Sequence, residues 1–211
     1  IGFAGAPFTL ASYLIEGAPS RTYTKTKALM MNEPELWDSL MSRLVEIVVS
    51  SLRSQISAGV SAIQLFDSWA GALSPSTYER FVLPYSKEIF SAIQNEEVPT
   101  IHFGVGTGEI LHLMASAGSS VMGVDWRTPL DVARDRLGLE VALQGNLDPA
   151  ICFASEDAIS TEVRNILEKN GGHPGHIFNL GHGVLPETNP QVLERIVEQV
   201  HSYPLNSAEM K

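Results

Sequence analysis

The sequence predicts an α/β fold, and within that class it favours a (β/α)8 TIM barrel of which this chain supplies about six strand–helix units. Short apolar runs alternate with longer segments whose apolar residues recur every three to four positions. Such alternation indicates parallel strands joined by right-handed crossovers. A doubly wound open sheet could also hold six strands. However, the chain starts at Ile1 inside an apolar strand without a methionine, so we expect preceding residues that supply the two other units of a barrel.

The first element is a short strand at 1–5, which leads into a loop and a helical turn carrying Tyr13 and Glu16. Asn32-Glu33-Pro34 then starts a long amphipathic helix that ends at Gly59. The apolar positions that recur along this helix are Leu36, Leu40, Leu44, Ile47 or Val48, and Leu52.

Turn and capping residues divide the remainder of the chain. The later strands are expected at 61–68, 98–103, 120–125, 140–147 and 176–180. The later helices are expected at 74–94, 109–117, 128–138, 155–170 and 189–203. Pro84 divides the first of these helices into two pieces, because proline interrupts a helix from within.

Composition indicates a single globular domain, residues 1–211, with a core of its own. Of the 211 residues, 44% are hydrophobic and 18% are charged. No apolar run approaches the ~20 residues needed to cross a bilayer, and the single cysteine, Cys152, fits a reducing compartment. We therefore expect a cytoplasmic protein without a membrane partner. The net charge of −10 argues against a nucleic-acid partner.

Polar side chains recur at the carboxyl ends of the predicted strands. They are Asp67, Ser68, His102, Asp125, Gln144, Asn146, Asp148, Asn179 and His182. In a parallel barrel these ends all lie on one face, where the connecting loops build the site. Asp148 precedes Pro149, and for this residue a helix cap is the simpler interpretation.

Two further patterns imitate cofactor sites. Gly104-Val105-Gly106-Thr107-Gly108 follows a strand as a dinucleotide-binding fingerprint does, but its third glycine comes one position early and it lies in the middle of the array. His173 and His176 have a metal-like spacing, yet we place both in a solvated loop on the amino-end side, away from the other polar groups. Zinc needs three or four ligands together, so we expect neither a nicotinamide cofactor nor a metal.

The stretch at 2–17 has two interpretations. Its aromatic residues Phe3, Phe8 and Tyr13 could pack in the core, as most buried aromatics do. Alternatively, they could offer faces to a flat ligand, because small glycines lie beside them at the end of a strand.

This stretch resembles the second signature of the uroporphyrinogen decarboxylase family: Gly2-Phe3, small residues, Pro7, an aromatic, Thr9-Leu10, then Tyr13 and Glu16-Gly17. The segments 64–71 (Gln-Leu-Phe-Asp-Ser-Trp-Ala-Gly), 144–149 (Gln-Gly-Asn-Leu-Asp-Pro) and 179–183 (Asn-Leu-Gly-His-Gly) resemble later motifs of that family. The resemblance covers nearly the whole chain in the right order and spacing.

What the resemblance implies is a cytoplasmic barrel enzyme of haem and tetrapyrrole biosynthesis, usually a homodimer whose clefts face each other. Members of the family remove carbon dioxide from the four acetate arms of uroporphyrinogen III without a cofactor and give coproporphyrinogen III. By the same resemblance, Tyr13, Ser68 and His182 correspond to substrate-binding positions. Phe3 and Phe66 correspond to apolar cleft walls.

The chemistry of this assignment is coherent. An acetate arm loses carbon dioxide easily once its pyrrole ring is protonated, because the ring then accepts the electrons of the breaking bond. Neutral donors such as Tyr13 and Ser68 hold a carboxylate without the strong ion pair that would favour its ground state. Aromatic walls suit the apolar faces of a macrocycle.

The resemblance leaves the catalytic residues unknown. The family's arginine-rich motif and its pyrrole-binding aspartate belong to a part that would lie before Ile1. Asp67 and Asp125 are not in the matching motif, so the role of that aspartate is not transferred to them. We expect that this piece alone neither closes the barrel nor catalyses at a useful rate.

Two alternatives remain open. Zinc-dependent cobalamin and thiol methyltransferases share the superfamily, but glycine stands in Ile101-His102-Phe103-Gly104 where their thiolate is expected, and no cysteine accompanies His182. The chain could also be a non-catalytic fragment or paralogue. The intact set of Tyr13, Ser68 and His182 argues against that interpretation.

Overall fold

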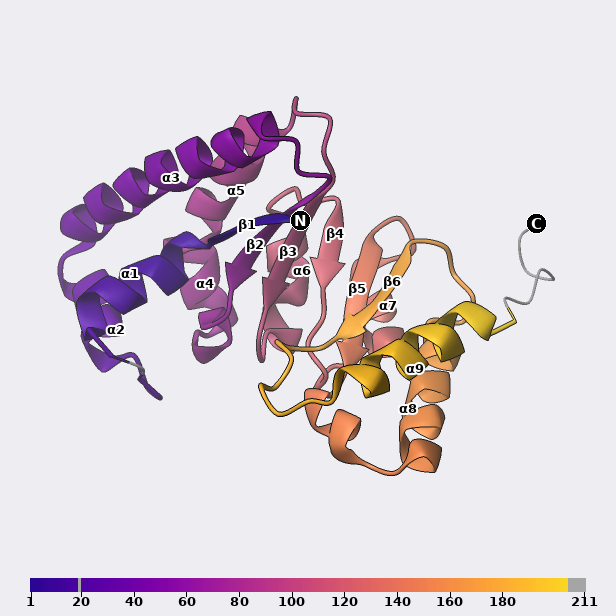
Figure 1. The fold of residues 1–211 in the computed structure, drawn as a ribbon. Helices are drawn as coiled ribbons and strands as arrows, with labels where there is room; N and C mark the ends of the chain where they lie inside the picture. The colour runs from indigo at the N-terminus through magenta and orange to yellow at the C-terminus, as the bar shows by residue number, and fades with distance from the viewer. Residues whose placement is uncertain (19, 205–211) are drawn as a thin grey trace. The chain divides into compact units, whose positions relative to one another are not determined.

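The computed structural model describes residues 1–18 and 20–204 (Figure 1). Its strands are β1 (Gly2–Gly5), β2 (Ile63–Asp67), β3 (Thr100–Gly104), β4 (Val121–Gly123), β5 (Ala142–Leu147) and β6 (His176–Leu180). Among the described residues they follow one another in this order in a six-stranded sheet, with β1 and β6 as the first and last strands. This confirms the α/β class and the six strand–helix units.

The chain divides into two compact units with a boundary after Met122. In the first unit, β1 pairs with β2 and β2 with β3, both in parallel. The helices of this unit are α1 (Pro7–Glu16), α2 (Thr24–Asn32), α3 (Pro34–Ser57), η1 (Ala70–Ala72), α4 (Pro75–Phe81), α5 (Leu83–Ile93), η2 (Gly108–Ile110) and α6 (Leu111–Ala115). The long helix α3 packs against α1, α5 and β1 (Figure 1).

Helix α3 buries a face that differs in part from the predicted one. Leu44 and Leu52 are buried as expected, and of the two alternatives Ile47 and Val48 the structure buries Val48. Leu36 is 56% exposed, and Trp37 and Met41 lie in the core instead. The Trp37 indole N–H also donates to the Phe81 carbonyl at 2.9 Å, and a bulky aromatic with a satisfied donor anchors the helix better than a leucine at the next position.

Helix α2 has no counterpart among the predicted elements. Its sequence, Thr24-Lys25-Thr26-Lys27-Ala28-Leu29-Met30-Met31-Asn32, lacks a clear apolar face. Tertiary contacts stabilise it: the Glu16 carboxylate accepts hydrogen bonds from both the backbone N–H and the hydroxyl of Thr26, each at 3.0 Å. Lys27 Nζ donates to the Ala72 carbonyl at 2.7 Å. Helix formation here depends on neighbours that local propensity does not reveal.

The edge strand β1 is covered by a side chain. The Gln55 amide oxygen accepts from the backbone N–H of Phe3 at 2.8 Å, and its nitrogen donates to the Phe3 carbonyl at 2.9 Å. One glutamine thereby satisfies both backbone groups of an edge residue, which would otherwise be open to another strand.

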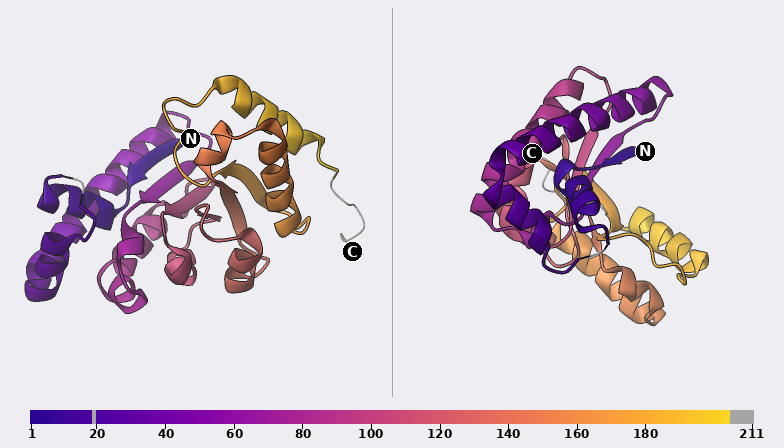
Figure 2. Two further views of the ribbon diagram at one scale, coloured as in Figure 1. Left: turned by 90° about the horizontal axis from the view of Figure 1, so that it is seen from below. Right: turned by 90° about the vertical axis from the view of Figure 1, so that its left-hand side faces the viewer.

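The second unit contains α7 (Leu130–Leu137), η3 (Pro149–Phe153), α8 (Glu156–Lys169) and α9 (Pro190–Ser202). β5 and β6 pair in parallel, with Asn146 opposite Asn179. α8 and α9 lie side by side (Figure 2) and bury Ile159, Val163, Ile166, Val192 and Ile196. Among the described residues, no helix combines the length and the apolar character that a membrane crossing needs.

Candidate active site

In the first unit the carboxyl ends of the parallel strands lie side by side. The register places Gly5 opposite Phe66 and Asp67 opposite Gly104. Successive residues of a strand point to opposite faces. Leu65 and Asp67 lie fully buried, and Asp67 bonds to α1, whereas Phe66 and Ser68 are partly exposed. Ser68 therefore belongs to the open face at this edge, and Asp67 belongs to the face that the helices cover.

Three phenylalanines from neighbouring strands form an aromatic row on the open face. The rings of Phe3 and Phe66 are 6.0 Å apart and those of Phe66 and Phe103 are 5.9 Å apart, both edge to face. Phe3 is 63% exposed, whereas Phe103 is buried. The structure thus brings together the two predicted wall residues, Phe3 and Phe66, and adds Phe103, to which the sequence motifs did not point.

Tyr13 lies in a second aromatic group, at the end of α1. The ring centroid of Tyr13 is 4.1 Å from that of Trp69. The ring centroid of Tyr23 is 5.2 Å from that of the same tryptophan. Tyr13 is 54% exposed, so its hydroxyl is available to a ligand. Trp69 directly follows Ser68, and this adjacency is the sequence signal that could have identified it.

Asp67 is held in place without a cation. Its Oδ1 accepts a hydrogen bond from the Thr9 hydroxyl at 3.0 Å, and Thr9 in turn accepts from the backbone N–H of Trp69 at 3.4 Å. Among the described residues, the Oδ2 atom of Asp67 has no hydrogen-bond partner. Burial raises the pKa of Asp67 to about 7, although the Thr9 hydrogen bonds act in the opposite direction. The pair Asp67–Thr9 links the loop after β2 to α1.

The glycine run after β3 lies against η1, and this close approach requires glycine at position 71. A Cβ atom on Gly71 would lie 2.2 Å from the Val105 carbonyl oxygen and 2.6 Å from that of Gly106. Only glycine permits this close approach of two backbones. The run that imitates a dinucleotide fingerprint therefore packs against η1.

His102 does not lie on the open face at the carboxyl ends of the strands, contrary to the prediction. It is fully buried, its Nδ1 donates to the Met114 carbonyl at 3.3 Å, and its ring lies 5.2 Å from that of Phe90. Burial lowers its pKa to about 4. The physical reason is strand alternation: Phe103 faces the aromatic row, so the preceding residue must face the helices.

In the second unit, His182 lies beside Trp126, with ring centroids 5.9 Å apart in an edge-to-face geometry. A Cβ atom on Gly181 would lie 2.4 Å from the Trp126 backbone nitrogen, so glycine is required for this approach. His182 itself is exposed. The predicted binding residue is thus held by its neighbours while its ring remains open.

The loop after β4 carries a charged pair. Arg127 Nη1 donates to Asp125 Oδ2 at 2.8 Å, and the guanidinium carbon lies 3.8 Å from the centroid of the Trp126 ring. Asn146 Nδ2 donates to the backbone carbonyl oxygens of Asp125 and Thr128, at 2.8 and 2.6 Å. Asn146 therefore braces the loop, although we predicted it as a residue of the site face.

Two other polar residues of this unit, Asp148 and His176, have structural roles. Asp148 accepts from the Ala150 N–H at 2.9 Å, which confirms the helix cap. His176 is the first residue of β6 and not a solvated loop residue: its Nε2 donates to the Gly145 carbonyl at 2.9 Å, and burial lowers its pKa. Among the described residues, no three His, Cys, Asp or Glu side chains gather in a group that could hold a metal ion.

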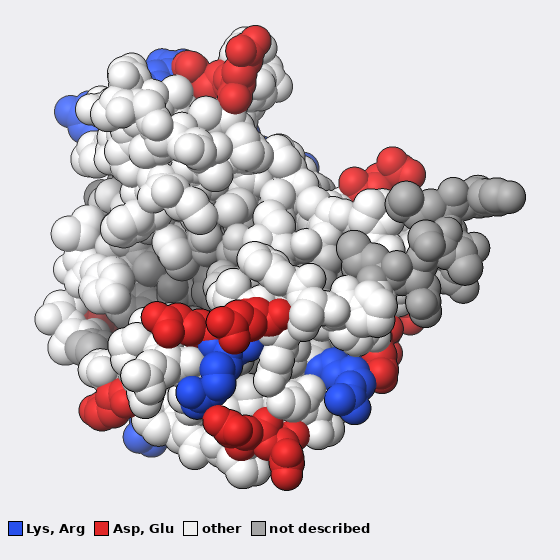
Figure 3. Space-filling model, turned by 45° about the vertical axis from the view of Figure 1, so that its right-hand side comes forward, with Lys and Arg blue, Asp and Glu red and all other residues white. Residues whose placement is uncertain are grey.

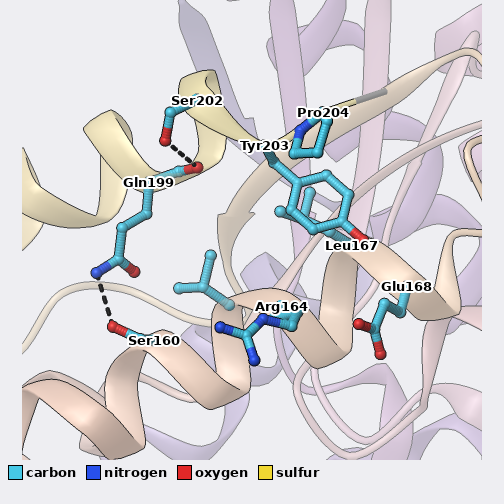
Figure 4. Close-up of a pocket in the computed structure, with 9 residues that line it drawn as sticks. Ser160, Arg164, Leu167, Glu168, Gln199, Ser202, Tyr203 and Pro204 are labelled. Carbon is cyan, nitrogen blue, oxygen red and sulfur yellow. Dashed lines mark hydrogen bonds between the residues drawn. The ribbon is translucent and has the colours of Figure 1, made fainter. Parts of the chain in front are cut away.

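A hollow of about 550 Å³ lies between α8 and α9, lined by residues that include Ser160, Arg164, Gln199 and Tyr203 (Figure 4). Gln199 Nε2 donates to the Ser160 hydroxyl at 2.8 Å across it. In a parallel βα unit the later part of each helix returns toward the amino ends of the strands, so this hollow is separate from the strand-end residues.

On the face in Figure 3, Lys and Arg side chains lie next to Asp and Glu and form no broad basic field.

Parallel strands in sequential order, with aromatic and neutral hydrogen-bonding groups at their carboxyl ends, define the class of (β/α) barrel proteins that bind ligands at that end. A family model described as "Uroporphyrinogen decarboxylase (URO-D)" matches residues 1–203. The chain belongs to this family, which confirms the resemblance drawn from its motifs.

Curated relatives agree. The chain is 62% identical over 201 residues to a uroporphyrinogen decarboxylase of Salinispora tropica, a match that covers 95% of the chain and 54% of the relative. It is 59% identical over 202 residues to one of Streptomyces coelicolor, covering 96% and 57%. One from Corynebacterium diphtheriae is 58% identical over 209 residues, covering 96% and 60%. The chain thus spans little more than half the length of these relatives.

A solved structure of a methyltransferase from Methanosarcina mazei superposes with a TM-score of 0.80 and 19% identity, covering 94% of this chain and 58% of that one. At this identity the likeness shows the fold alone. It supports the predicted α/β barrel fold.

Proposed function

We propose that the full-length protein containing this chain decarboxylates the four acetate arms of uroporphyrinogen III to give coproporphyrinogen III. The observation that carries the proposal is the 62% identity to a relative named as a uroporphyrinogen decarboxylase. The strand-end residues support it, because aromatic rings and neutral hydrogen-bond donors suit a flat macrocycle with carboxylate arms. The proposal includes a cytoplasmic homodimer that acts without a cofactor.

In this proposal the residues of the first unit bind and orient the macrocycle. Phe3 and Phe66 form an apolar wall, and Tyr13 and Ser68 donate hydrogen bonds to a carboxylate arm. The contact of Tyr13 with Trp69, at 4.1 Å between ring centroids, holds the phenol ring in one orientation. Because these donors are neutral, they bind the reacting arm without stabilising its charged ground state as strongly as an arginine would.

In the second unit, His182 provides a further hydrogen bond to an arm. The ring protonation that starts the reaction needs an acid and a stabilising anion, and the proposal assigns neither role to a described residue of this chain. The isolated chain is accordingly expected to give no turnover. Coproporphyrinogen formation by the isolated chain would contradict this expectation.

The test of the function is direct. The full-length protein is incubated with uroporphyrinogen III under reducing conditions, the products are oxidised, and the porphyrins are separated by their number of carboxylates. We expect a series of products with successively fewer carboxylates, in protein treated with a chelator as well. No loss of carboxylates would overturn the function. Activity that depends on stoichiometric zinc would favour the methyltransferase alternative.

The residue assignments are tested by conservative variants. Tyr13→Phe keeps the ring beside Trp69 and removes the hydroxyl, so KM should rise about tenfold for one lost hydrogen bond to a charged group. Tyr203→Phe, in the hollow between α8 and α9, is the matched control and should leave KM unchanged. His182→Ala should also raise KM without a change in unfolding temperature, and unchanged kinetics in both site variants would refute the assignments.

A further inference from the structure

The Arg127 side chain is restricted by its contacts with Asp125 and Trp126, but part of its guanidinium is exposed to solvent. Its backbone N–H and its Nη1 both donate to the Asp125 carboxylate, at 3.3 and 2.8 Å, and its guanidinium stacks on Trp126. The Arg127 side chain is nevertheless 52% exposed, whereas the Asp125 side chain is 1% exposed. A buried carboxylate and an aromatic ring therefore fix the guanidinium, while a large part of its donor surface faces solvent.

The unused donors of Arg127 are suited to a carboxylate. A guanidinium carries N–H donors on Nε and on both Nη atoms in one plane, and in the described structure its hydrogen bonds use Nη1 alone. The other donors can grip a second carboxylate in the planar, two-bond geometry that arginine favours. Because Asp125 and Trp126 already restrict the side chain, little conformational entropy is lost when such a ligand binds.

Two neighbouring rings, those of Trp126 and His182, extend the surface around Arg127 that a ligand could contact. Trp126, on which it stacks at 3.8 Å, contacts the ring of the exposed His182 at 5.9 Å. We name these residues, Arg127, Trp126 and His182, the Arg127 cluster. The cluster combines a cation, an aromatic surface and a further hydrogen-bonding ring within one unit, at the carboxyl-end side of its strands.

We propose that the Arg127 cluster is a binding subsite for a carboxylate arm that the substrate keeps through the reaction. This inference rests on the proposed function. A permanent cation on the reacting carboxylate would stabilise the ground state and slow the loss of carbon dioxide. The same cation on a retained arm binds the substrate and the transition state equally, so it lowers KM and leaves kcat unchanged.

The experiment compares Arg127→Gln with Arg164→Gln in the full-length protein. Arg164 lies on α8 beside the hollow and is exposed, so its variant removes the same charge elsewhere in the same unit. For Arg127→Gln we expect KM for uroporphyrinogen III to rise about tenfold, as for the loss of a charge-assisted hydrogen bond, with kcat within about twofold. Arg164→Gln should match the wild type. Arg127→Lys should lie between wild type and Arg127→Gln, because lysine keeps the charge without the planar fork.

Added salt provides a second measurement. The ratio of KM between Arg127→Gln and wild type should shrink as ionic strength rises, because salt screens an exposed charge pair. A purely structural role of Arg127 would not produce this dependence.

Arg127→Gln removes the ion pair with the buried Asp125, so that variant could unfold. Asp125→Asn/Arg127→Gln removes both charges, and it is the deciding variant in that case. An unchanged KM in the folded variant, or a fall in kcat in place of a rise in KM, would overturn the inference. Inactivity of the wild type would instead refute the proposed function, so the two failures are distinguishable.

Discussion

Asp67 and Asp125 lie at comparable places, since one ends β2 in the first unit and the other follows β4 in the second. Both side chains are buried. Asp125 bonds to the guanidinium of Arg127, whereas Asp67 bonds to the neutral hydroxyl of Thr9. The difference teaches that a buried carboxylate can be tolerated in two ways: by a cation, or by a pKa raised until the group holds a proton near neutral pH.

The two environments also serve different purposes. Asp67 fastens the loop after β2 to α1 and so positions Ser68 and Trp69, but it lies on the helix-covered face. Asp125 anchors a cation whose other side is open. Asp67 can fasten the loop in its protonated, neutral form. Asp125 must be ionised to hold the Arg127 guanidinium.

The largest expected effect concerns the pH dependence of stability at Asp67. Its pKa is about 7 in the folded protein and near the ordinary value of about 3.9 in the unfolded chain. Between these values the folded state binds the extra proton, so the contribution of Asp67 to the free energy of unfolding should fall as pH rises from about 4 to 7, by on the order of 4 kcal/mol. Asp67→Asn removes this contribution. The difference in the free energy of urea unfolding between the wild-type full-length protein and this variant, across the pH range, measures it.

His102 provides the control for this experiment. Burial lowers its pKa to about 4, so the folded state resists protonation and stability should fall as pH drops from about 6.5 to 4. Asp67→Asn should therefore reveal a profile that declines on the acid side alone. A profile parallel to that of the wild type would show that Asp67 is charged in the folded protein.

The next effect tests whether Asp125 depends on its cation. Arg127→Gln removes the ion pair between a half-exposed guanidinium and a buried carboxylate, and should lower the free energy of unfolding by about 3 kcal/mol. Asp125→Asn in the same chain should restore part of this loss, because the buried charge is gone. Chemical unfolding of both single variants and the double variant gives the coupling energy. Strict additivity of the two changes would contradict the pairing.

A smaller effect tests the backbone approach that holds Trp126. Gly181→Ala places a Cβ atom 2.4 Å from the Trp126 nitrogen, so the loop must shift, at a cost of about 2 kcal/mol. Gly183→Ala is the matched control, because nothing lies within 4 Å of its added Cβ atom. Thermal unfolding and KM measure the two. Equal behaviour of both variants would show that the close approach does not constrain His182.

The smallest effect tests the hydrogen bond that Asp67 accepts from the Thr9 hydroxyl. Thr9→Val removes it and should raise the Asp67 pKa further, because the Thr9 hydroxyl holds it down. The expected cost is about 1 kcal/mol above pH 7, where the carboxylate is charged, and less near pH 5. Thr107→Val removes a bond to the neutral Gly104 carbonyl, so its cost should not vary with pH. The same pH dependence in both variants would refute the prediction.

Much of the fold could be predicted because strands and amphipathic helices leave periodic patterns. The boundaries of β6 and the break between α4 and α5 at Val82 follow from Gly, Pro and capping residues. Helix α2 could not be predicted, because bonds from Glu16 and Lys27 stabilise it and these join separate segments.

The candidate site was predicted in part. Local motifs pointed to Phe3, Phe66, Tyr13, Ser68 and His182 as candidate binding residues, and four of them lie in the first unit. The alternation rule, applied residue by residue, could have separated Phe103 from His102. By contrast, the role of Arg127 depends on the stacking of its guanidinium over Trp126, and no spacing in the sequence encodes that contact.

The sequence by itself determined the alternating α/β architecture, the family and the residues of its motifs, because periodicity and short-range motifs are properties of neighbouring positions. Only the tertiary structure decided which strand-end side chains are exposed to solvent and which of the buried ones are paired with a charged group. His102 and Asp67 lie under helices, whereas Arg127 keeps an open side. Burial and charge pairing arise between residues distant in sequence, and these two quantities set the ionisation of each group.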